Sequence, residues 1–243
     1  MFVHHRTQGI ILKKADRGEA DQLFTVYTSK FGKISVMGRS IRKVRSKLRA
    51  GMDLFYLSEI EFIQGNYYKI LTDALVLDKF SAIGESLERR TVARKMAECL
   101  DFLVKGQETE EKIWRLLLDT LGLLSIPDFP RKKLKILYYY FFWNLVSLLG
   151  YQPELFKCQK CKRKLEPEKI YFLALEGGMV CQSCYSGQKQ GLKVTSDIVK
   201  IMRLIAAQNK KTLCNLKVKK EHLELLSKTS QEYLAFVGGG VVK

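Results

Sequence analysis

The sequence of 243 residues is poor in acidic side chains, with 25 Asp and Glu against 42 Lys and Arg and a formal net charge of +17. It also has no long apolar run: the longest, residues 136–149, is too short to span a bilayer. No apolar signal segment follows Met1, so we expect a cytoplasmic protein without a membrane partner. The excess of positive charge predicts a polyanionic partner, with nucleic acid as the first candidate.

Motifs of common catalytic sites are missing as well. No phosphate-binding GxxxxGK[ST] loop occurs, and the three histidines, His4, His5 and His222, do not form a zinc-protease motif. A nuclease needs several carboxylates that converge on metal ions. The acidic residues of 108–111 are better explained as favourable charge at the start of a helix. A binding protein that is not an enzyme is the simplest hypothesis.

Residues 1–80 have the pattern of a small β-barrel. Five short runs rich in β-branched and aromatic residues are separated by turn-forming residues. Five strands in about 80 residues are typical of the OB-fold, a barrel that often binds nucleic acids, although an SH3-like barrel has nearly the same signature. The predicted strands are Gly9–Lys13, Leu23–Thr28, Ile34–Gly38, Leu54–Ile63 and Tyr67–Ala74.

After residue 86 the apolar residues recur with a helical period. The segment Leu134–Leu149 is apolar on nearly every side, which predicts a helix at the centre of a bundle. The stretch Thr195-Ser196-Asp197 offers an N-cap for a helix that runs through Ala207, and Glu221–Val237 is amphipathic. A bundle of helices is therefore expected to follow the barrel.

Four of the six cysteines, Cys158, Cys161, Cys181 and Cys184, form two Cys-x2-Cys pairs separated by 19 residues. Two such pairs can direct four thiolates to one point, which suits a tetrahedral zinc ion (Zn²⁺) with a structural role. Disulfides are disfavoured because nothing directs the chain to an oxidising compartment. An iron–sulfur cluster is the weaker alternative. The other two cysteines, Cys99 and Cys214, are expected to be buried free thiols.

Together these patterns predict an α+β multidomain chain. Its parts are an N-terminal five-stranded OB-fold barrel at 1–80, an α-helical bundle domain made of 81–156 and 191–243, and an inserted four-cysteine, zinc-ribbon-like module at 157–190.

The positive charge is densest between Lys30 and Arg49, where eight Lys and Arg side chains occur before the next acid, Asp53. One explanation is an exposed edge kept soluble by charge. We favour a phosphate-binding track, because half of the cluster is arginine, whose guanidinium binds phosphate oxygens in pairs. The candidate residues are Lys33, Arg39, Arg42, Lys43, Arg45, Lys47 and Arg49.

Aromatic residues of the predicted barrel are candidates for stacking on bases. We expect most of them to belong to the core, with one or two exposed. They are Phe24, Tyr27, Phe55, Tyr56, Tyr67 and Tyr68.

Several of these stretches resemble one known family, the bacterial RecO family. The similarity covers nearly the whole chain in order and motif, and it is weaker after Gly191. The segments that carry it are ADQLFTVYT at 20–28, FGKISV at 31–36, the basic stretch 38–49 ending in SKLR, LLGYQPEL at 148–155 before Cys158, and Gly177-Gly178 before Cys181.

The resemblance implies an OB-fold, a helical domain and a zinc module. It also implies a recombination mediator at the bacterial nucleoid that binds single- and double-stranded DNA and anneals complementary strands. Such a protein works with RecR and helps to load RecA onto strands coated by single-strand-binding protein. The seven basic candidates would then contact DNA. Two alternatives stay open: an RNA-binding zinc-ribbon factor in translation or transcription, and a protein-binding scaffold.

Overall fold

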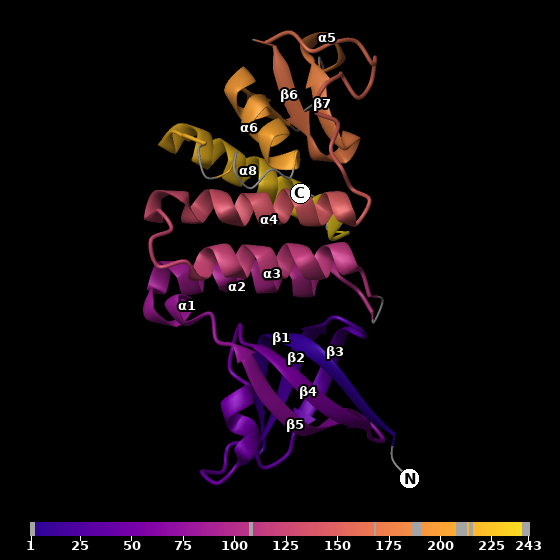
Figure 1. Cartoon of the computed structure of the whole chain (residues 1–243). Helices are drawn as coiled ribbons and strands as arrows, with labels where there is room; N and C mark the ends of the chain where they lie inside the picture. Colours follow the sequence, from indigo (N-terminus) through magenta and orange to yellow (C-terminus); the bar gives the residue numbers. More distant parts are fainter. Residues whose placement is uncertain are drawn as a thin grey trace. The chain divides into compact units, whose positions relative to one another are not determined.

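The computed structural model describes residues 3–106, 109–167, 169–185, 191–207, 213 and 216–239 (Figure 1). It divides into two compact units, Met1–Phe129 and Pro130–Lys243, each of which is described by itself below. The expected α+β fold class is confirmed, with a barrel, several helices and a cysteine cluster. The division into three domains stays a prediction, and Cys214 lies outside the described residues.

The first unit begins with a closed five-stranded barrel in the order β1-β2-β3-β5-β4, in which β3 and β5 run parallel. This order is that of the OB-fold and decides against the SH3-like alternative. Every predicted strand overlaps an observed one. The strands are β1 His4–Arg17, β2 Asp21–Thr28, β3 Gly32–Gly38, β4 Leu57–Gln64 and β5 Lys69–Asp78.

Side chains along each strand point alternately into the barrel and out of it, and the inward-pointing ones fill its interior. Along β4, Ser58, Ile60 and Phe62 are buried, while the residues between them are partly exposed. Phe24 and Ile11 belong to the same buried cluster. Burial of these large apolar side chains is the main contribution to the stability of the barrel.

The connection from β3 to β4 contains a short 3-10 helix, η1 Lys47–Gly51, that packs against β5. The contact is close at Gly51, where a Cβ atom would lie 2.5 Å from the carbonyl oxygen of Ala74. The Ser58 hydroxyl, buried inside the barrel, donates a hydrogen bond of 2.6 Å to the Gly51 carbonyl. The end of the basic stretch 38–49 is therefore anchored to the barrel.

Three helices complete the first unit: α1 Ser81–Glu85, α2 Leu87–Leu103 and α3 Glu111–Ser125. Arg89 on α2 is buried and donates to the carbonyl oxygens of Leu124, Ile126 and Pro127 at the end of α3. Leu124 lies in the last turn of α3, where carbonyls lack partners within the helix, and Ile126 and Pro127 follow it directly, so the guanidinium acts as a C-terminal cap.

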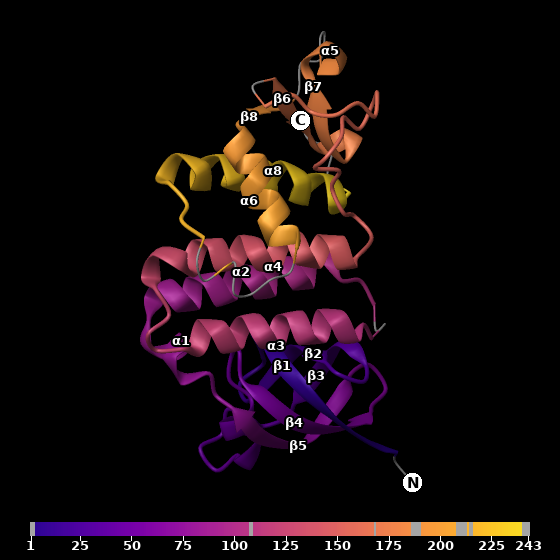
Figure 2. The ribbon, with the colours of Figure 1, turned by 45° about the horizontal axis from the view of Figure 1, so that its top comes forward.

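The second unit packs helices against a small sheet. Its helices include α4 Leu134–Leu148, α6 Ser196–Ala206 and α8 Lys220–Val237, and α4 contacts both of the others (Figure 2). The burial of α4 on most sides agrees with its predicted central place. Of the three residues predicted to offer the N-cap of α6, Thr195 is the one that does so, since its hydroxyl accepts from the N–H of Ile198. None of the described helices combines the length and apolar character needed to cross a bilayer.

The sheet of the second unit has the order β7-β6-β8, with β6 Ile170–Leu173, β7 Gly178–Cys181 and β8 Leu192–Val194. Three aromatic rings join it to the helices: Phe172 of β6 contacts Trp143 of α4 and Tyr233 of α8, with centroids 6.1 and 5.6 Å away. The cysteine-bearing segment therefore shares a core with the bundle.

The close approach at Gly51 generates a stability prediction. Gly51→Ala forces the backbone of η1 away from Ala74, and we expect it to destabilise the protein by about 1–3 kcal/mol. Gly84→Ala is the matched control, because a Cβ there meets nothing within 4 Å and alanine suits the helix α1. Urea denaturation measures both variants, and an unchanged midpoint for Gly51→Ala would contradict the prediction.

Candidate metal site and nucleic-acid interface

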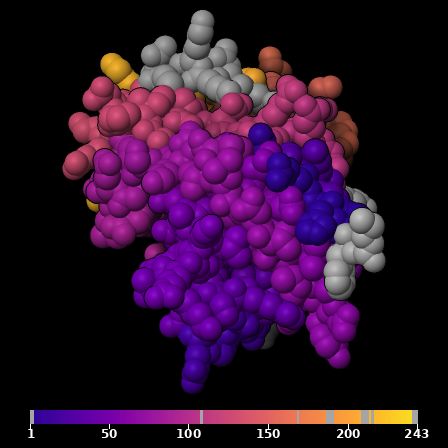
Figure 3. Space-filling model, turned by 60° about the horizontal axis from the view of Figure 1, so that its bottom comes forward, coloured from indigo at the N-terminus to yellow at the C-terminus, as the bar shows by residue number. Residues whose placement is uncertain are grey.

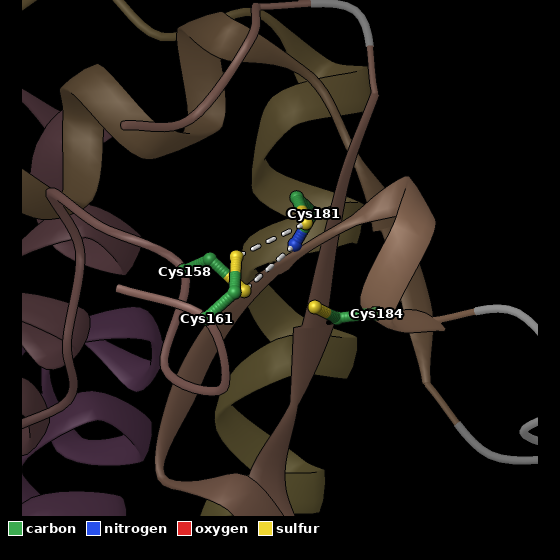
Figure 4. A group of neighbouring side chains, drawn as sticks. All are labelled: Cys158, Cys161, Cys181 and Cys184. Atoms are coloured by element: carbon green, nitrogen blue, oxygen red, sulfur yellow. Dashed lines mark hydrogen bonds between the residues drawn. The ribbon is translucent and has the colours of Figure 1, made fainter. Parts of the chain in front are cut away.

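The four predicted cysteine ligands come together in the second unit (Figure 4). All four sulfur atoms lie within 4.8 Å of one another, and the Sγ atoms of Cys161 and Cys181 are 3.7 Å apart. A tetrahedral ion with metal–sulfur distances of about 2.3 Å needs sulfurs roughly 3.8 Å apart. The cluster could therefore hold a metal ion with only small adjustments of the side chains.

Short backbone turns aim the first pair of sulfurs. The N–H of Lys162 donates to the carbonyl of Cys158 at 2.8 Å, and the N–H of Cys158 donates to the carbonyl of Arg163 at 2.8 Å. Cys181 ends β7, and its N–H points to the Cys158 sulfur at 3.4 Å. Such N–H donors stabilise negative charge on sulfur, as metal-bound thiolates require.

A glycine allows the chain that carries the second cysteine pair to pack closely against the chain before the first pair. Gly178, the first residue of β7, has a φ of 159°, and a Cβ there would lie 2.5 Å from the carbonyl oxygen of Glu154. The N–H of Met179 donates to this carbonyl at 2.9 Å, and the N–H of Glu154 donates to the Gly177 carbonyl at 3.0 Å. The chain before Cys158 therefore runs directly against the start of β7.

Two of the thiols, Cys161 and Cys184, have pKa values shifted in opposite directions. A hydrogen bond from the Arg163 side chain, at 3.4 Å from the Cys161 sulfur, is the main reason that the pKa of Cys161 falls to about 6. Hydrogen bonding to Cys161 and then to Cys181 raises the pKa of Cys184 to about 12. One shell cannot carry four negative sulfurs without a cation at its centre, and a bound metal ion removes that conflict. Sequence reasoning missed Arg163, although a basic residue two positions after a ligand was a usable signal.

In the first unit, hydrogen bonds attach the basic segment, defined as residues 39–49, to the turn between β1 and β2. The N–H of Ser40 donates to Asp21 at 2.7 Å, and the N–H of Arg42 donates to the carbonyl of Ala20 at 3.0 Å. The guanidinium of Arg42 also lies 3.4 Å from the Asp16 carboxylate. In OB-folds this turn is one of the two loops that border the nucleic-acid face.

Six of the seven basic candidates belong to this segment and are exposed. The barrel, in indigo and violet, forms the lower part of the face shown in Figure 3. Lys33, the seventh, lies near the start of β3, and its ammonium donates to the carboxylate and carbonyl of Asp101 at 2.9 and 2.5 Å. The side chain of Lys33 is only 18% exposed. The structure thus brings six candidates together and places Lys33 against α2. The exposed candidates are Arg39, Arg42, Lys43, Arg45, Lys47 and Arg49.

Aromatic residues occupy the other loop of the OB-fold face. Tyr67 and Tyr68, in the turn from β4 to β5, are 92% and 40% exposed, whereas Phe24 and Tyr27 are buried. The expectation of one or two exposed barrel aromatics is therefore confirmed. Lys69, the next residue, pairs with Val36 of β3. Both loops thus border the second half of β3.

Comparison with known proteins agrees with this architecture. The family model described as "Recombination protein O N terminal" matches residues 1–80, and "Recombination protein O C terminal" matches residues 84–240. The chain is 30% identical over 232 residues to "DNA repair protein RecO" of Dehalococcoides mccartyi (strain CBDB1), covering 96% of this chain and 90% of that protein.

Two further relatives with the same name come from other bacteria. The protein of Acetivibrio thermocellus is 30% identical over 94% of this chain and 90% of its own length. That of Oceanobacillus iheyensis is 26% identical over 98% of this chain and 90% of its own length. With both family models matched and relatives of similar length along almost the whole chain, the chain belongs to the Recombination protein O (RecO) family.

Proposed function

We propose that the chain is a DNA repair and recombination mediator that binds single- and double-stranded DNA and anneals complementary strands without catalytic turnover. The observation that carries this proposal is the exposed basic segment attached to one loop of an OB-fold whose other loop presents Tyr67 and Tyr68. Its relatives are named as DNA repair proteins, which favours DNA over RNA as the ligand.

Annealing requires neutralised phosphates rather than bond cleavage. Two strands repel each other through their phosphates, and Lys and Arg contacts displace the counterions that screen them. Exposed aromatic rings add stacking that tolerates any sequence, worth about 1–3 kcal/mol per base. A surface with both features can hold a single strand while its bases stay free to pair.

We propose Zn²⁺ as the ion of the cysteine cluster. An all-cysteine shell in which all four positions come from the protein is typical of structural zinc and leaves no position for a reacting water molecule. The ion would hold the turn at Cys158 against β7, and through β6 it would support the aromatic contact with α4 and α8.

We propose that the protein acts in the cytoplasm at the bacterial nucleoid with RecR, and that it helps RecA to replace single-strand-binding protein on DNA. Membership of the RecO family supports these partners. Annealing assays with strands coated by single-strand-binding protein, with and without RecR, test them directly. Annealing that stops completely on coated strands, with RecR present, would argue against the mediator role.

The basic segment should determine the salt dependence of binding. In the variant Lys43→Gln, Arg45→Gln, Lys47→Gln, three exposed charges are lost. If each contacts one phosphate, the slope of log affinity against log salt for single-stranded DNA falls in magnitude by about 2. Fluorescence anisotropy over a salt series measures this slope.

The matched control removes the same charge elsewhere. Lys217→Gln, Lys219→Gln, Lys228→Gln changes three lysines of the second unit, and its slope should stay near that of the unchanged protein. Equal slopes for both variants would show that the basic segment is not the DNA track. Competition between DNA and RNA strands of equal length distinguishes the RNA-binding alternative, which requires a strong preference for RNA.

Metal analysis tests the zinc proposal. We expect about one zinc per chain, and Cys158→Ser should lose it together with much of the stability of the second unit, because structural zinc contributes on the order of 10 kcal/mol in small domains. Cys99→Ala is the control: this buried thiol lies outside the cluster, so the variant loses some stability but keeps its zinc. A folded protein without bound metal, or with iron in place of zinc, would refute the proposal.

A further inference from the structure

The first unit contains a second concave surface that is not part of the basic segment. A groove of about 1050 Å³ lies between the barrel and the helices α1 and α2. Its barrel wall consists of Leu12–Lys14 on β1 and the turn 53–56, and its helical wall includes Arg90, Arg94 and Phe102 of α2. We call this surface the α2 groove.

Local irregularities of the chain shape the barrel wall. The register of β1 against β2 shifts between Ile11 and Lys13, as at a β-bulge, so three consecutive residues, Leu12–Lys14, line one groove. In a regular strand, neighbouring side chains point to opposite faces. Opposite the bulge, Phe55 has a left-handed φ of 66°, and its N–H donates to the Ile11 carbonyl at 2.9 Å. Bulges and strained residues of this kind are common beside functional surfaces.

Two arginines of the helical wall stand beside the acids Glu85 and Glu98. Arg90 and Arg94 are exposed and lie one turn apart on α2, where like charges repel. No ion pair joins either of them to another residue that the structure describes. The other cations of the groove are Lys13, Lys14, Lys79 and Lys105.

Half of the acids in the groove are already neutralised. Asp53 pairs with Lys14 at 2.5 Å, and Asp101 pairs with Lys33 at 2.9 Å. Lys33, which sequence analysis assigned to the phosphate track, thereby removes a negative charge from the α2 groove. Glu85 and Glu98 are the remaining acids that line it. The groove as a whole thus favours an anion.

The α2 groove adjoins the basic segment. A smaller hollow of about 370 Å³ is lined by Arg42 and Arg49, and it shares Lys14 and Asp53 with the α2 groove. The groove also exposes an aromatic ring, Phe102, which is 44% exposed and has the Lys105 ammonium 5.1 Å from its centre. Cations that alternate with an aromatic ring suit a polynucleotide strand, whose phosphates and bases alternate in the same way.

We propose that the α2 groove extends the DNA track beyond the barrel, with Arg90 and Arg94 as phosphate contacts for a single strand that also crosses the basic segment. This inference rests on the proposed DNA binding. It implies a footprint longer than the barrel alone provides, since one OB-fold covers about 4–16 nucleotides.

Strand length tests this proposal. Binding of thymidine oligonucleotides of about 8 and about 30 nucleotides is compared, the shorter being within reach of a single OB-fold. For Arg90→Gln, Arg94→Gln we expect unchanged affinity for the short strand and, for the long strand, a salt slope lower in magnitude by about 1.4, which corresponds to two lost phosphate contacts. Lys112→Gln, Arg115→Gln on α3 is the matched control, because it removes two exposed charges outside the groove.

A second variant tests the groove through an expected gain of affinity for DNA, where the arginine variant tests it through a loss. Glu98→Gln removes an acid that lines the groove and should strengthen binding of the long strand but not of the short one. Circular dichroism confirms that each variant is folded.

The outcomes separate the two proposals. If the unchanged protein binds neither strand, DNA binding itself is wrong. If it binds both while the α2 variants match it at both lengths, only the α2 groove is wrong. If the arginine variant binds DNA normally but loses affinity for polyglutamate, the groove receives an acidic protein segment and the inference is overturned.

Discussion

The short parallel contact between β3 and β5 closes the barrel, and the arrangement of the first unit depends on it. The contact consists of two residue pairs, Val36 with Lys69 and Met37 with Ile70. β3 ends at Gly38, one residue after this contact, and the chain must then cross from there to the start of β4 at Leu57. The basic segment makes this crossing, and η1 seals it against β5 through Gly51. A requirement of barrel closure therefore sets the place where the cations of one short stretch reach solvent.

Local patterns in the sequence were sufficient for much of the fold. Period-two and period-3.6 patterns located the strands and the main helices, because each pattern lies within one short stretch of sequence. The spacing of the cysteines located the cluster, because each pair lies within four residues. The order of strands was not predictable, since OB and SH3-like barrels have the same local pattern. The position of Lys33 beside α2 was not predictable either, because its partner Asp101 is 68 residues away in the sequence.

Two ion pairs show why a count of charges describes a surface poorly. Lys14 and Lys33 add to the net charge of the chain, yet each is paired with an acid, Asp53 or Asp101. The Lys14–Asp53 pair is exposed, and pairs of that kind add little stability. The larger effect of both pairs is on the surrounding potential, because each pair neutralises one carboxylate that would otherwise compete with an anion for the nearby arginines.

The aromatic contact between β6 and the helices gives the protein an optical readout of its own. The chain has two tryptophans, one in each unit: Trp114 lies 6.3 Å from Tyr27 of the barrel, and Trp143 lies 6.1 Å from Phe172 of the cysteine-bearing sheet. Replacing either indole leaves a single fluorophore. Emission from Trp143 then follows the cysteine-bearing unit, and emission from Trp114 follows the barrel, so that ligand events in the two units become separable in one sample.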